Sequence, residues 1–183
     1  MGYLRLVHSV PLLPTPRSAC LDTFERELDY IFATLQRLGA SPHEIEDIVQ
    51  EIFVVLHRNW AELDTDRPLR PYLFGVAYRI LCAHHRRRAR EIPYPDLDVL
   101  DGAPSPESSL QGKQAIELLS AALAELPLAR RAVVVMHDLD EMPMVDIARG
   151  LSITRFGAYA RLRKGRKELA AAVRRRSRGG ARG

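Results

Sequence analysis

The chain has 183 residues and a net charge of +4, and 46% of its residues are hydrophobic, so neither a disordered nor a fibrous protein fits this composition. The two cysteines, Cys20 and Cys82, belong to no CxxC or Cys/His cluster, which argues against a disulfide framework and a structural zinc site. No apolar run approaches the roughly 20 residues of a membrane-spanning helix. We therefore expect a cytoplasmic protein without direct membrane insertion.

Three amphipathic helix patterns occupy the first half of the chain. Asp22 followed by Glu25 predicts an N-cap pair for one helix that ends at Gly39. Ser41-Pro42-His43-Glu44 is a capping box with proline at the first helical position, and the helix it opens runs to about Trp60. Pro71 opens the third helix, which runs into an arginine cluster. These patterns predict an N-terminal arm over residues 1–17 and a compact bundle of three to four helices over 18–92.

Residues 93–113 contain four prolines and no strong apolar period, so we expect a flexible linker there. The apolar spacing then predicts a helix from about Ile116 that is broken at Pro127, a short helix from Pro143, and a long last helix capped by Thr154. This gives a second domain over 114–178 and a short tail over 179–183. The predicted fold is all-α, with two small helical domains joined by the linker.

Charge is strongly segregated along the chain. From Asp22 to Asp66 there are eleven acidic residues and three arginines, a net charge of −8, whereas eleven basic residues and one acidic residue follow from Arg155 onward, a net charge of +10. Such asymmetry suggests a polyanionic partner for the basic end. Arginine outnumbers lysine 24 to 3, which suits bidentate contacts to phosphate and guanine but is equally what a GC-rich genome encodes.

The segment Pro143–Arg166 has the form of a helix-turn-helix: a short helix, a tight turn through Gly150–Ile153, and a helix rich in cations. Tyr159, Arg163 and Arg166 recur on one predicted face at spacings of three to four residues. Arg155, Phe156 and Lys164 flank them. A helix of this kind fits the DNA major groove, with its cations on the phosphates. The alternative is a helical hairpin whose arginines only keep it soluble, and the local charge favours DNA binding.

Two further charged patterns leave both a functional and a structural interpretation open. The arginine cluster Arg86–Arg90 complements the dipole at the end of the third helix, but it holds more cations than capping needs and therefore also suits nucleic acid. Asp47, Gln50 and Glu51 lie off the apolar stripe of the second helix, where such a face is usually solvated.

Catalytic and metal-binding patterns are absent from the sequence. His84 and His85 are adjacent and would point about 100° apart on a helix, which is unsuitable for binding one metal together. No GxxxxGK[ST], HExxH or GxSxG motif occurs. We therefore expect no enzymatic activity, no metal, no cofactor and no small-molecule substrate.

The two halves together resemble a known family. The segments Asp47–Phe53 and Tyr72–Arg79, with the arginine cluster that follows, resemble region 2 of the sigma-70 family, and Leu119–Leu169 resembles region 4. Two such segments, joined by a short linker and without regions 1.1 and 3, are similar to the extracytoplasmic function (ECF, group IV) sigma factors. The resemblance covers about residues 20–176.

The resemblance implies an RNA polymerase subunit that recognises promoters. Four positions would bind the β′ clamp of core polymerase: Asp47, Gln50, Glu51 and Phe53. Six would recognise and melt the −10 element: Tyr72, Arg79, Arg86, Arg87, Arg88 and Arg90. Seven would contact the −35 element, near the β flap: Thr154, Arg155, Phe156, Tyr159, Arg163, Lys164 and Arg166. The family also implies an anti-sigma factor as a partner, which can hold the chain at the inner membrane.

The sequence departs from the family pattern at several of these positions. Tyr72 stands where the family usually has tryptophan, Arg79 where it has asparagine, and Ala83 where it has aspartate. Gly157-Ala158 replaces the common Thr-Val of the last helix. Two other interpretations are a stand-alone helix-turn-helix regulator, which would need a dimer and a palindromic site, and a basic helical adaptor with no DNA role. The Asp-x-x-Gln-Glu motif argues against both.

Overall fold

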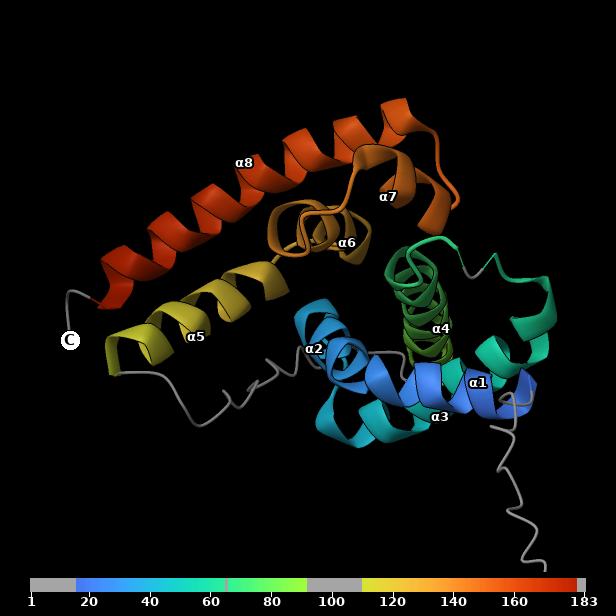
Figure 1. Cartoon of the computed structure of the whole chain (residues 1–183). Coiled ribbons are helices and arrows are strands. Elements are labelled where there is room, and N and C mark those ends of the chain that lie inside the picture. Colours follow the sequence, from blue (N-terminus) through green and yellow to red (C-terminus); the bar gives the residue numbers. More distant parts are fainter. Residues whose placement is uncertain (1–15, 65, 92–109, 181–183) are drawn as a thin grey trace, which may run out of the picture.

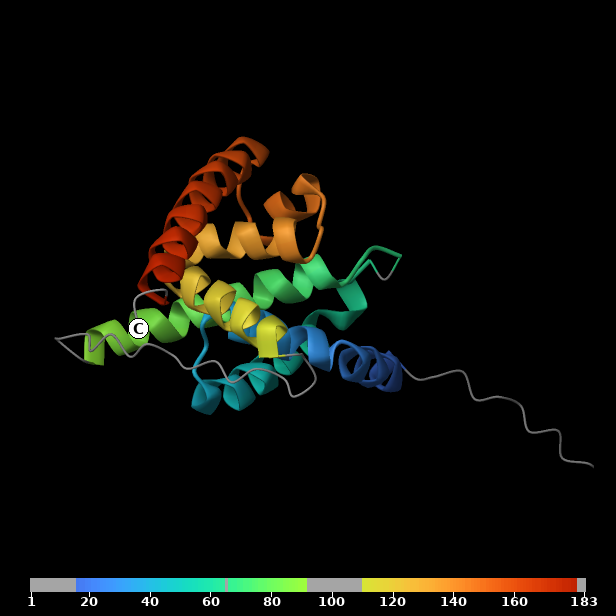
Figure 2. The same cartoon turned by 90° about the vertical axis from the view of Figure 1, so that its left-hand side faces the viewer.

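The computed structural model describes residues 16–64, 66–91 and 110–180, and within these ranges the chain is helical and contains no strand (Figures 1 and 2). The all-α prediction is confirmed. Among these residues, no helix combines the length and the apolar character that crossing a membrane would require. The predicted linker lies outside the described residues up to residue 109, as does the N-terminal arm up to residue 15.

Four α-helices and a 3₁₀ turn form the N-terminal bundle. They are α1 (Pro16–Arg26), α2 (Leu28–Leu38), α3 (Pro42–Asn59), the turn η1 (Trp60–Glu62) and α4 (Arg70–Glu91). The capping box of α3 is confirmed, because the Glu44 carboxylate accepts a hydrogen bond from the Ser41 N–H at 3.1 Å. Gly39 ends α2 in the left-handed conformation, with φ of 87°.

The single helix predicted between Asp22 and Gly39 is wrong, because the chain bends at Glu27 and forms two helices. Asp22 lies in the middle of α1 and is not an N-cap. The bend lets the two helices reach different partners: α1 packs on α3 through Phe24 and Phe53, whereas α2 packs on α4 and α5 as well as on α3. The Glu27 carboxylate at the bend accepts a hydrogen bond from Arg70, at the start of α4, at 2.8 Å.

The second half consists of α5 (Leu110–Ala124), α6 (Leu128–Val134), the π-helical turn η2 (Val135–Leu139), α7 (Met144–Gly150) and α8 (Arg155–Gly180). The first of these helices begins within the last residues of the predicted linker. The predicted break falls where Pro127 precedes α6. Helix α8 begins as predicted, because the Thr154 Oγ1 accepts a hydrogen bond from the Gly157 N–H at 3.0 Å. In the helix-turn-helix it is Ser152, with φ of 53°, that adopts the left-handed conformation, not Gly150.

Helix α4 is the central element of the molecule. In both views it lies between the N-terminal helices and the layer of α6 and α7 (Figures 1 and 2), and it contacts α2 and α3 from its own half and α7 from the other. Five successive residues, Leu73 to Ala77, are buried. A surface helix buries only one stripe, so burial all round shows that α4 is covered on opposite sides. The two bundles therefore share one continuous core.

Candidate protein and nucleic-acid interfaces

Helix α3 presents an exposed polar strip formed by Asp47, Gln50 and Glu51. The opposite stripe of the helix, which includes Ile48 and Ile52, is fully buried. The three strip residues lie at spacings of three and four, so they share one face of the helix. This acidic strip is the face that the sequence predicted, and a basic protein surface is the partner that its charge favours.

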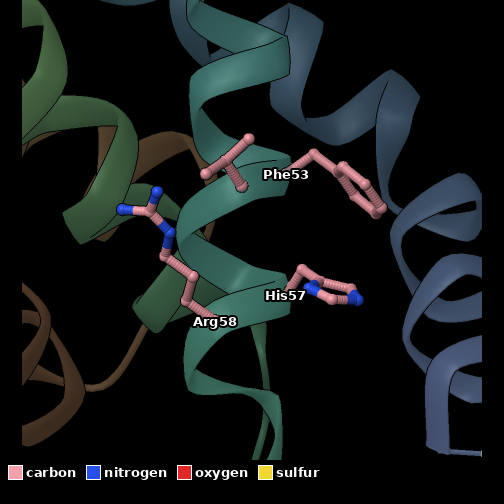
Figure 3. Close-up of a pocket in the computed structure, with 4 residues that line it drawn as sticks. Phe53, His57 and Arg58 are labelled. Carbon is pink, nitrogen blue, oxygen red and sulfur yellow. The ribbon is translucent and has the colours of Figure 1, made fainter.

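Phe53 lies three residues after Gln50, at the edge of the acidic strip, and its ring turns toward α1. Its ring packs at a centroid distance of 5.0 Å from Phe24 of α1 and 5.9 Å from His57. Figure 3 shows Phe53 and His57 pointing to one side of α3 and Arg58 to the other. These three residues and Val54 line a surface hollow of about 260 Å³. The ring of Phe53 is therefore engaged with α1 and with its own helix, whereas the three polar residues it was grouped with are exposed.

The C-terminal part of α4 carries an open cationic hollow. Arg86, Arg87, Arg90 and Ala83 line a volume of about 320 Å³, which we call the arginine hollow. Arg88 points elsewhere, because its Nη1 lies 3.6 Å from a carboxylate oxygen of Glu44 on α3. Three of the four clustered arginines thus face the same space. This is more positive charge than is needed to complement the helix dipole, and it suits binding to a phosphate backbone.

The two other α4 residues predicted to contact DNA lie at its N-terminal part, near α7. Tyr72 is half-buried against the shared core. The Arg79 side chain donates a hydrogen bond from Nη1 to the carbonyl oxygen of Gly150, at the end of α7, at 3.2 Å. In this arrangement Arg79 is engaged within the chain, whereas the arginine hollow is open.

Helix α8 presents an unobstructed face of aromatic and cationic side chains. Phe156 is 83% exposed and Tyr159 is 53% exposed, which is unusual for aromatic residues of this size. Arg155, Arg163 and Lys164 are exposed beside them, and we call these five residues the α8 face. Thr154 holds the helix start through its cap hydrogen bond. The face combines base-stacking surfaces with phosphate-binding cations.

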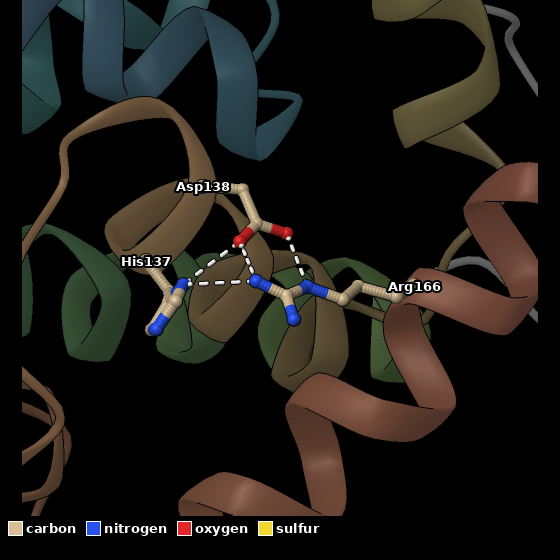
Figure 4. A network of polar contacts seen from close by, with 3 residues as sticks. All are labelled: His137, Asp138 and Arg166. Atoms are coloured by element: carbon tan, nitrogen blue, oxygen red, sulfur yellow. Dashed lines mark hydrogen bonds and ion pairs between the residues drawn. The ribbon is translucent and has the colours of Figure 1, made fainter.

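The sequence analysis grouped Arg166 with the residues of this face, but in the structure Arg166 forms an ion pair within the chain. Its guanidinium donates to both carboxylate oxygens of Asp138 in η2, from Nε at 2.9 Å and from Nη2 at 2.5 Å (Figure 4). His137 Nδ1 lies 2.8 Å from the same carboxylate. The hydrogen bonds from Arg166 hold the pKa of Asp138 below its usual value. A bidentate pair of this kind fixes α8 against η2.

Two residues that the sequence did not single out join the halves. The buried guanidinium of Arg131 on α6 donates to the carbonyl oxygen of Leu38, the last residue of α2, at 2.6 Å. It also donates to the carbonyl oxygens of Ala124 and Leu126 at 2.5 and 3.0 Å. Burial away from water lowers the pKa of Arg131 to about 10. In sequence this residue looks like one more exposed arginine.

Asp140, just after η2, is the second such residue, and its side chain is only 6% exposed. One carboxylate oxygen accepts a hydrogen bond from the Tyr30 hydroxyl at 3.0 Å, and the other pairs with Arg37 at 2.8 Å, both from α2. Burial raises the pKa of Asp140, and the neighbouring tyrosine and arginines oppose this shift. The sequence analysis did not foresee a contact between the halves; the apolar run Leu73–Ala77, which is too wide for one helical stripe, is a signal that could have indicated it.

Among the described residues no group of three or more histidine, cysteine or acidic side chains is placed to hold a metal ion. In the part of the chain that the structure describes, the acidic strip, the arginine hollow and the α8 face are surfaces suited to macromolecular partners.

Comparison with known families matches both halves of the chain. Residues 23–91 match the family model of sigma-70 region 2, and residues 116–169 match that of sigma-70 region 4. The ECF RNA polymerase sigma factor SigW of Bacillus subtilis is 24% identical over 166 residues, which cover 84% of this chain and 88% of that protein. The ECF sigma factor SigF of Caulobacter vibrioides is 29% identical over 145 residues, or 77% of each chain.

Solved structures of sigma factors have the same fold. The sigma factor RpoE from Bartonella quintana, in complex with the anti-sigma factor NepR, superposes with a TM-score of 0.65 at 18% identity and covers 84% of this chain and 98% of its own. CnrH, in complex with the cytosolic domain of CnrY, superposes with a TM-score of 0.58 at 21% identity and covers 84% of this chain and 86% of its own.

Proposed function

The chain belongs to the sigma-70 family as an ECF-type RNA polymerase sigma factor. From this premise we propose which of its surfaces binds core polymerase and which contact promoter DNA. A sigma factor binds core RNA polymerase and directs it to promoters, so the stand-alone regulator is not favoured. The domain boundaries proposed are 18–92 for region 2 and 114–178 for region 4. We propose binding roles only, and no reaction catalysed by this chain.

The acidic strip on α3 is the proposed site for the β′ clamp of core polymerase. The observation that carries this proposal is the exposure of Asp47, Gln50 and Glu51 opposite a fully buried stripe, within the segment that matches region 2. Asp47 and Gln50 are free of packing and capping roles, whereas the Glu51 carboxylate also lies 2.9 Å from Nε2 of His84 on α4. Phe53 would contribute indirectly, by fixing α3 against α1.

The two DNA-contacting surfaces are proposed on α4 and α8. Arg86, Arg87 and Arg90 would follow the phosphates of the −10 region, and Tyr72 and Arg79 would act there once the strands part. Arg88 would serve mainly to hold α4 to α3 through Glu44. The α8 face would contact the −35 element, with Thr154 and Arg166 holding the helix in position.

An anti-sigma protein is the proposed regulator. The two solved structures that share this fold were determined as complexes with NepR and with the cytosolic domain of CnrY, which supports a comparable partner for this chain. The proposed location is the cytoplasm, where core polymerase works, with a membrane-bound regulator as one way of holding the chain at the inner membrane.

Reconstitution with bacterial core RNA polymerase tests the proposed function. The purified chain should co-elute with core enzyme and direct run-off transcripts from fragments of its own genome, and core enzyme alone should not. Replacing Asp47 and Gln50 with alanine should weaken core binding without loss of helicity, because both side chains are solvent-exposed. Glu25→Ala, which removes one exposed negative charge from α1, is the matched control. Unchanged core affinity in the double variant would refute the assignment of the strip.

A further inference from the structure

Helix α8 is longer than the segment that matches sigma-70 region 4. The match ends at residue 169, whereas the helix continues to Gly180. The helix runs along the outer edge of the molecule (Figure 1). Its residues after 169 include four arginines, Arg174, Arg175, Arg176 and Arg178, and no acidic residue. The family match therefore assigns no role to these last turns of α8.

The four arginines form two pairs with different surroundings. Arg175 and Arg176 both donate hydrogen bonds to the carboxylate of Glu125, just after α5, and the bond from Nε of Arg176 measures 2.7 Å. Arg174 and Arg178 are exposed, and neither forms a hydrogen bond or an ion pair with any residue that the structure describes. The first pair fixes the last turns of α8 to the end of α5, and the second pair is available for a partner.

Arg174 and Arg178 continue a face of α8 that begins nearer its start. Lys167, Arg174 and Arg178 follow Arg163 by four, eleven and fifteen residues, which rotates them by only about 40°, 20° and 60° around the helix axis. All four side chains are exposed, whereas buried residues such as Ala172 lie on the other side of the helix. We call these four residues the α8 stripe, which extends for about 22 Å along the axis.

The charge of the α8 stripe exceeds what the helix end requires. Arg178 lies in the last turn and complements the helix dipole there. Arg174 lies nearly two turns before Gly180, and the effect of the dipole falls off within the last turn. A row of cations on one face fits a partner with regularly spaced anions, and duplex DNA carries about one negative charge per 1.7 Å of its axis. Arginine also binds phosphate in a bidentate manner.

The length of α8 separates its last turns from the bases of the −35 element. A recognition helix contacts base edges through its N-terminal residues, and the major groove is about 12 Å wide. Arg174 lies about 28 Å along the axis from Arg155, where α8 begins. Arg174 and Arg178 therefore lie outside the groove that the α8 face would occupy. From there they can meet phosphates of the same duplex, which contribute affinity without sequence information.

We propose that Arg174 and Arg178 form a second, sequence-independent site for the phosphates of duplex DNA that flanks the −35 element. The pairing of Arg175 and Arg176 with Glu125 holds the helix that presents this site. The site acts on duplex DNA, so it stabilises the promoter complex before the strands part. This inference rests on the proposed function, because it takes the α8 face to contact the −35 element.

The test is the double variant Arg174→Ala and Arg178→Ala in the full chain. Both side chains are exposed and alanine favours a helix, so helicity should be retained. Binding is measured by fluorescence anisotropy on a fluorescein-labelled, mixed-sequence duplex that extends well beyond both ends of α8. Loss of two phosphate contacts should reduce the slope of log affinity against log salt by about 1.8, so the advantage of the wild type should shrink roughly tenfold between 50 and 200 mM salt.

A matched control removes the same charge from the same turns of α8. Arg175→Ala with Arg176→Ala also deletes two arginines, but their guanidiniums are already paired with Glu125. This variant should therefore change the salt slope less. In polymerase holoenzyme, the Arg174 and Arg178 variant should lose the same factor of affinity on a promoter fragment and on one with a scrambled −35 element, because phosphate contacts carry no sequence information.

The outcomes separate this inference from the proposed function. An unchanged salt slope with helicity retained would overturn the second site. An equal fall in both double variants would also overturn it, because net charge alone would then explain the effect. Weaker binding to core polymerase with unchanged DNA binding would overturn it as well, and would place the two arginines at a protein interface. Failure of the wild type to direct transcription with core enzyme would instead refute the proposed function, whatever the salt slope shows.

Discussion

The two DNA surfaces proposed for this chain differ in their accessibility. The five residues of the α8 face include Phe156, which is 83% exposed, whereas α4 is open at the arginine hollow and covered by α7 at Gly75, with the exposed Arg79 hydrogen-bonded to Gly150. The proposed −35 surface would therefore be accessible to duplex DNA without a change in the chain. On the proposed −10 surface, Tyr72 is half-buried beside the core and Arg79 is hydrogen-bonded to Gly150, so we expect this surface to act only once the DNA strands part.

The polar contacts that keep α4 covered include a buried cation, and its removal should have the largest effect on stability. Arg131→Met would leave three carbonyl groups without a donor, and each such group costs about 1–3 kcal/mol, partly offset because a buried charge is removed as well. We expect a net loss of about 3 kcal/mol in the free energy of unfolding, measured by urea denaturation.

Arg130→Met is the matched control for this change. Arg130 pairs with Glu168 at 2.7 Å but is partly exposed, so its loss should cost less than about 1 kcal/mol. Equal destabilisation by the two substitutions would show that Arg131 contributes no more than a surface ion pair, and that the shared apolar core alone joins the halves.

Sequence patterns predicted the local features of this fold well because those features depend on neighbouring residues. The Ser41–Glu44 capping box and the Thr154 cap join groups within three residues of each other. The bend at Glu27 escaped prediction because no glycine or proline marks it, and the apolar spacing of α2 continues from α1 without a visible break. It follows from which helices α1 and α2 pack against.

For the candidate surfaces too, the sequence predicted what depends on neighbouring residues and missed what depends on residues far away in the chain. Helical periodicity placed Asp47, Gln50 and Glu51 on one exposed face, but it could not show that Phe53 turns toward α1 or that Arg166 pairs with Asp138, because both partners lie far away in the sequence. Gly150 looked like a turn residue. Its role as a contact point for α4 depends on the packing of the two halves, which no local pattern encodes.

On the open surface, single substitutions should act directly on DNA binding. Arg163→Ala should weaken binding of the polymerase holoenzyme to promoter fragments by about 1–3 kcal/mol and relax specificity at one −35 position if Arg163 contacts a base, or reduce the salt dependence by about one charge if it contacts phosphate. Arg175→Ala, at the far end of α8 and paired with Glu125, is the control. Footprints identical to wild type over the −35 region would contradict the assignment.

On the covered surface, Tyr72→Ala should spare the closed promoter complex and impair opening. An aromatic ring stacks on an unpaired base with about 1–3 kcal/mol, and duplex DNA offers no such base. The variant should therefore show little permanganate-reactive thymine near −10, and a premelted template should restore much of its transcription. Tyr72 is half-buried beside the core, so absence of rescue would show that its role is packing.

The smallest effect is expected where α8 is tied to η2, at the pair of Arg166 and Asp138. Both side chains are partly exposed, so Asp138→Asn should lower the free energy of unfolding by only about 0.2–1 kcal/mol. Because the hydrogen bonds from Arg166 lower the pKa of Asp138 in the folded chain, the contribution of the pair is fully present above the carboxyl's ordinary pKa of about 3.9 and is lost as the pH falls through the lowered value.

The difference in stability between wild type and Asp138→Asn should therefore stay constant as the pH is lowered from 5 toward about 4, and shrink below that. Urea denaturation across this range measures it. DNA binding gives the second half of the test: if Arg166 serves to hold α8 and not to contact DNA, Arg166→Ala and Asp138→Asn should weaken −35 binding to the same small extent. A much larger loss of binding for Arg166→Ala than for Asp138→Asn would show that the Arg166 guanidinium contacts DNA directly.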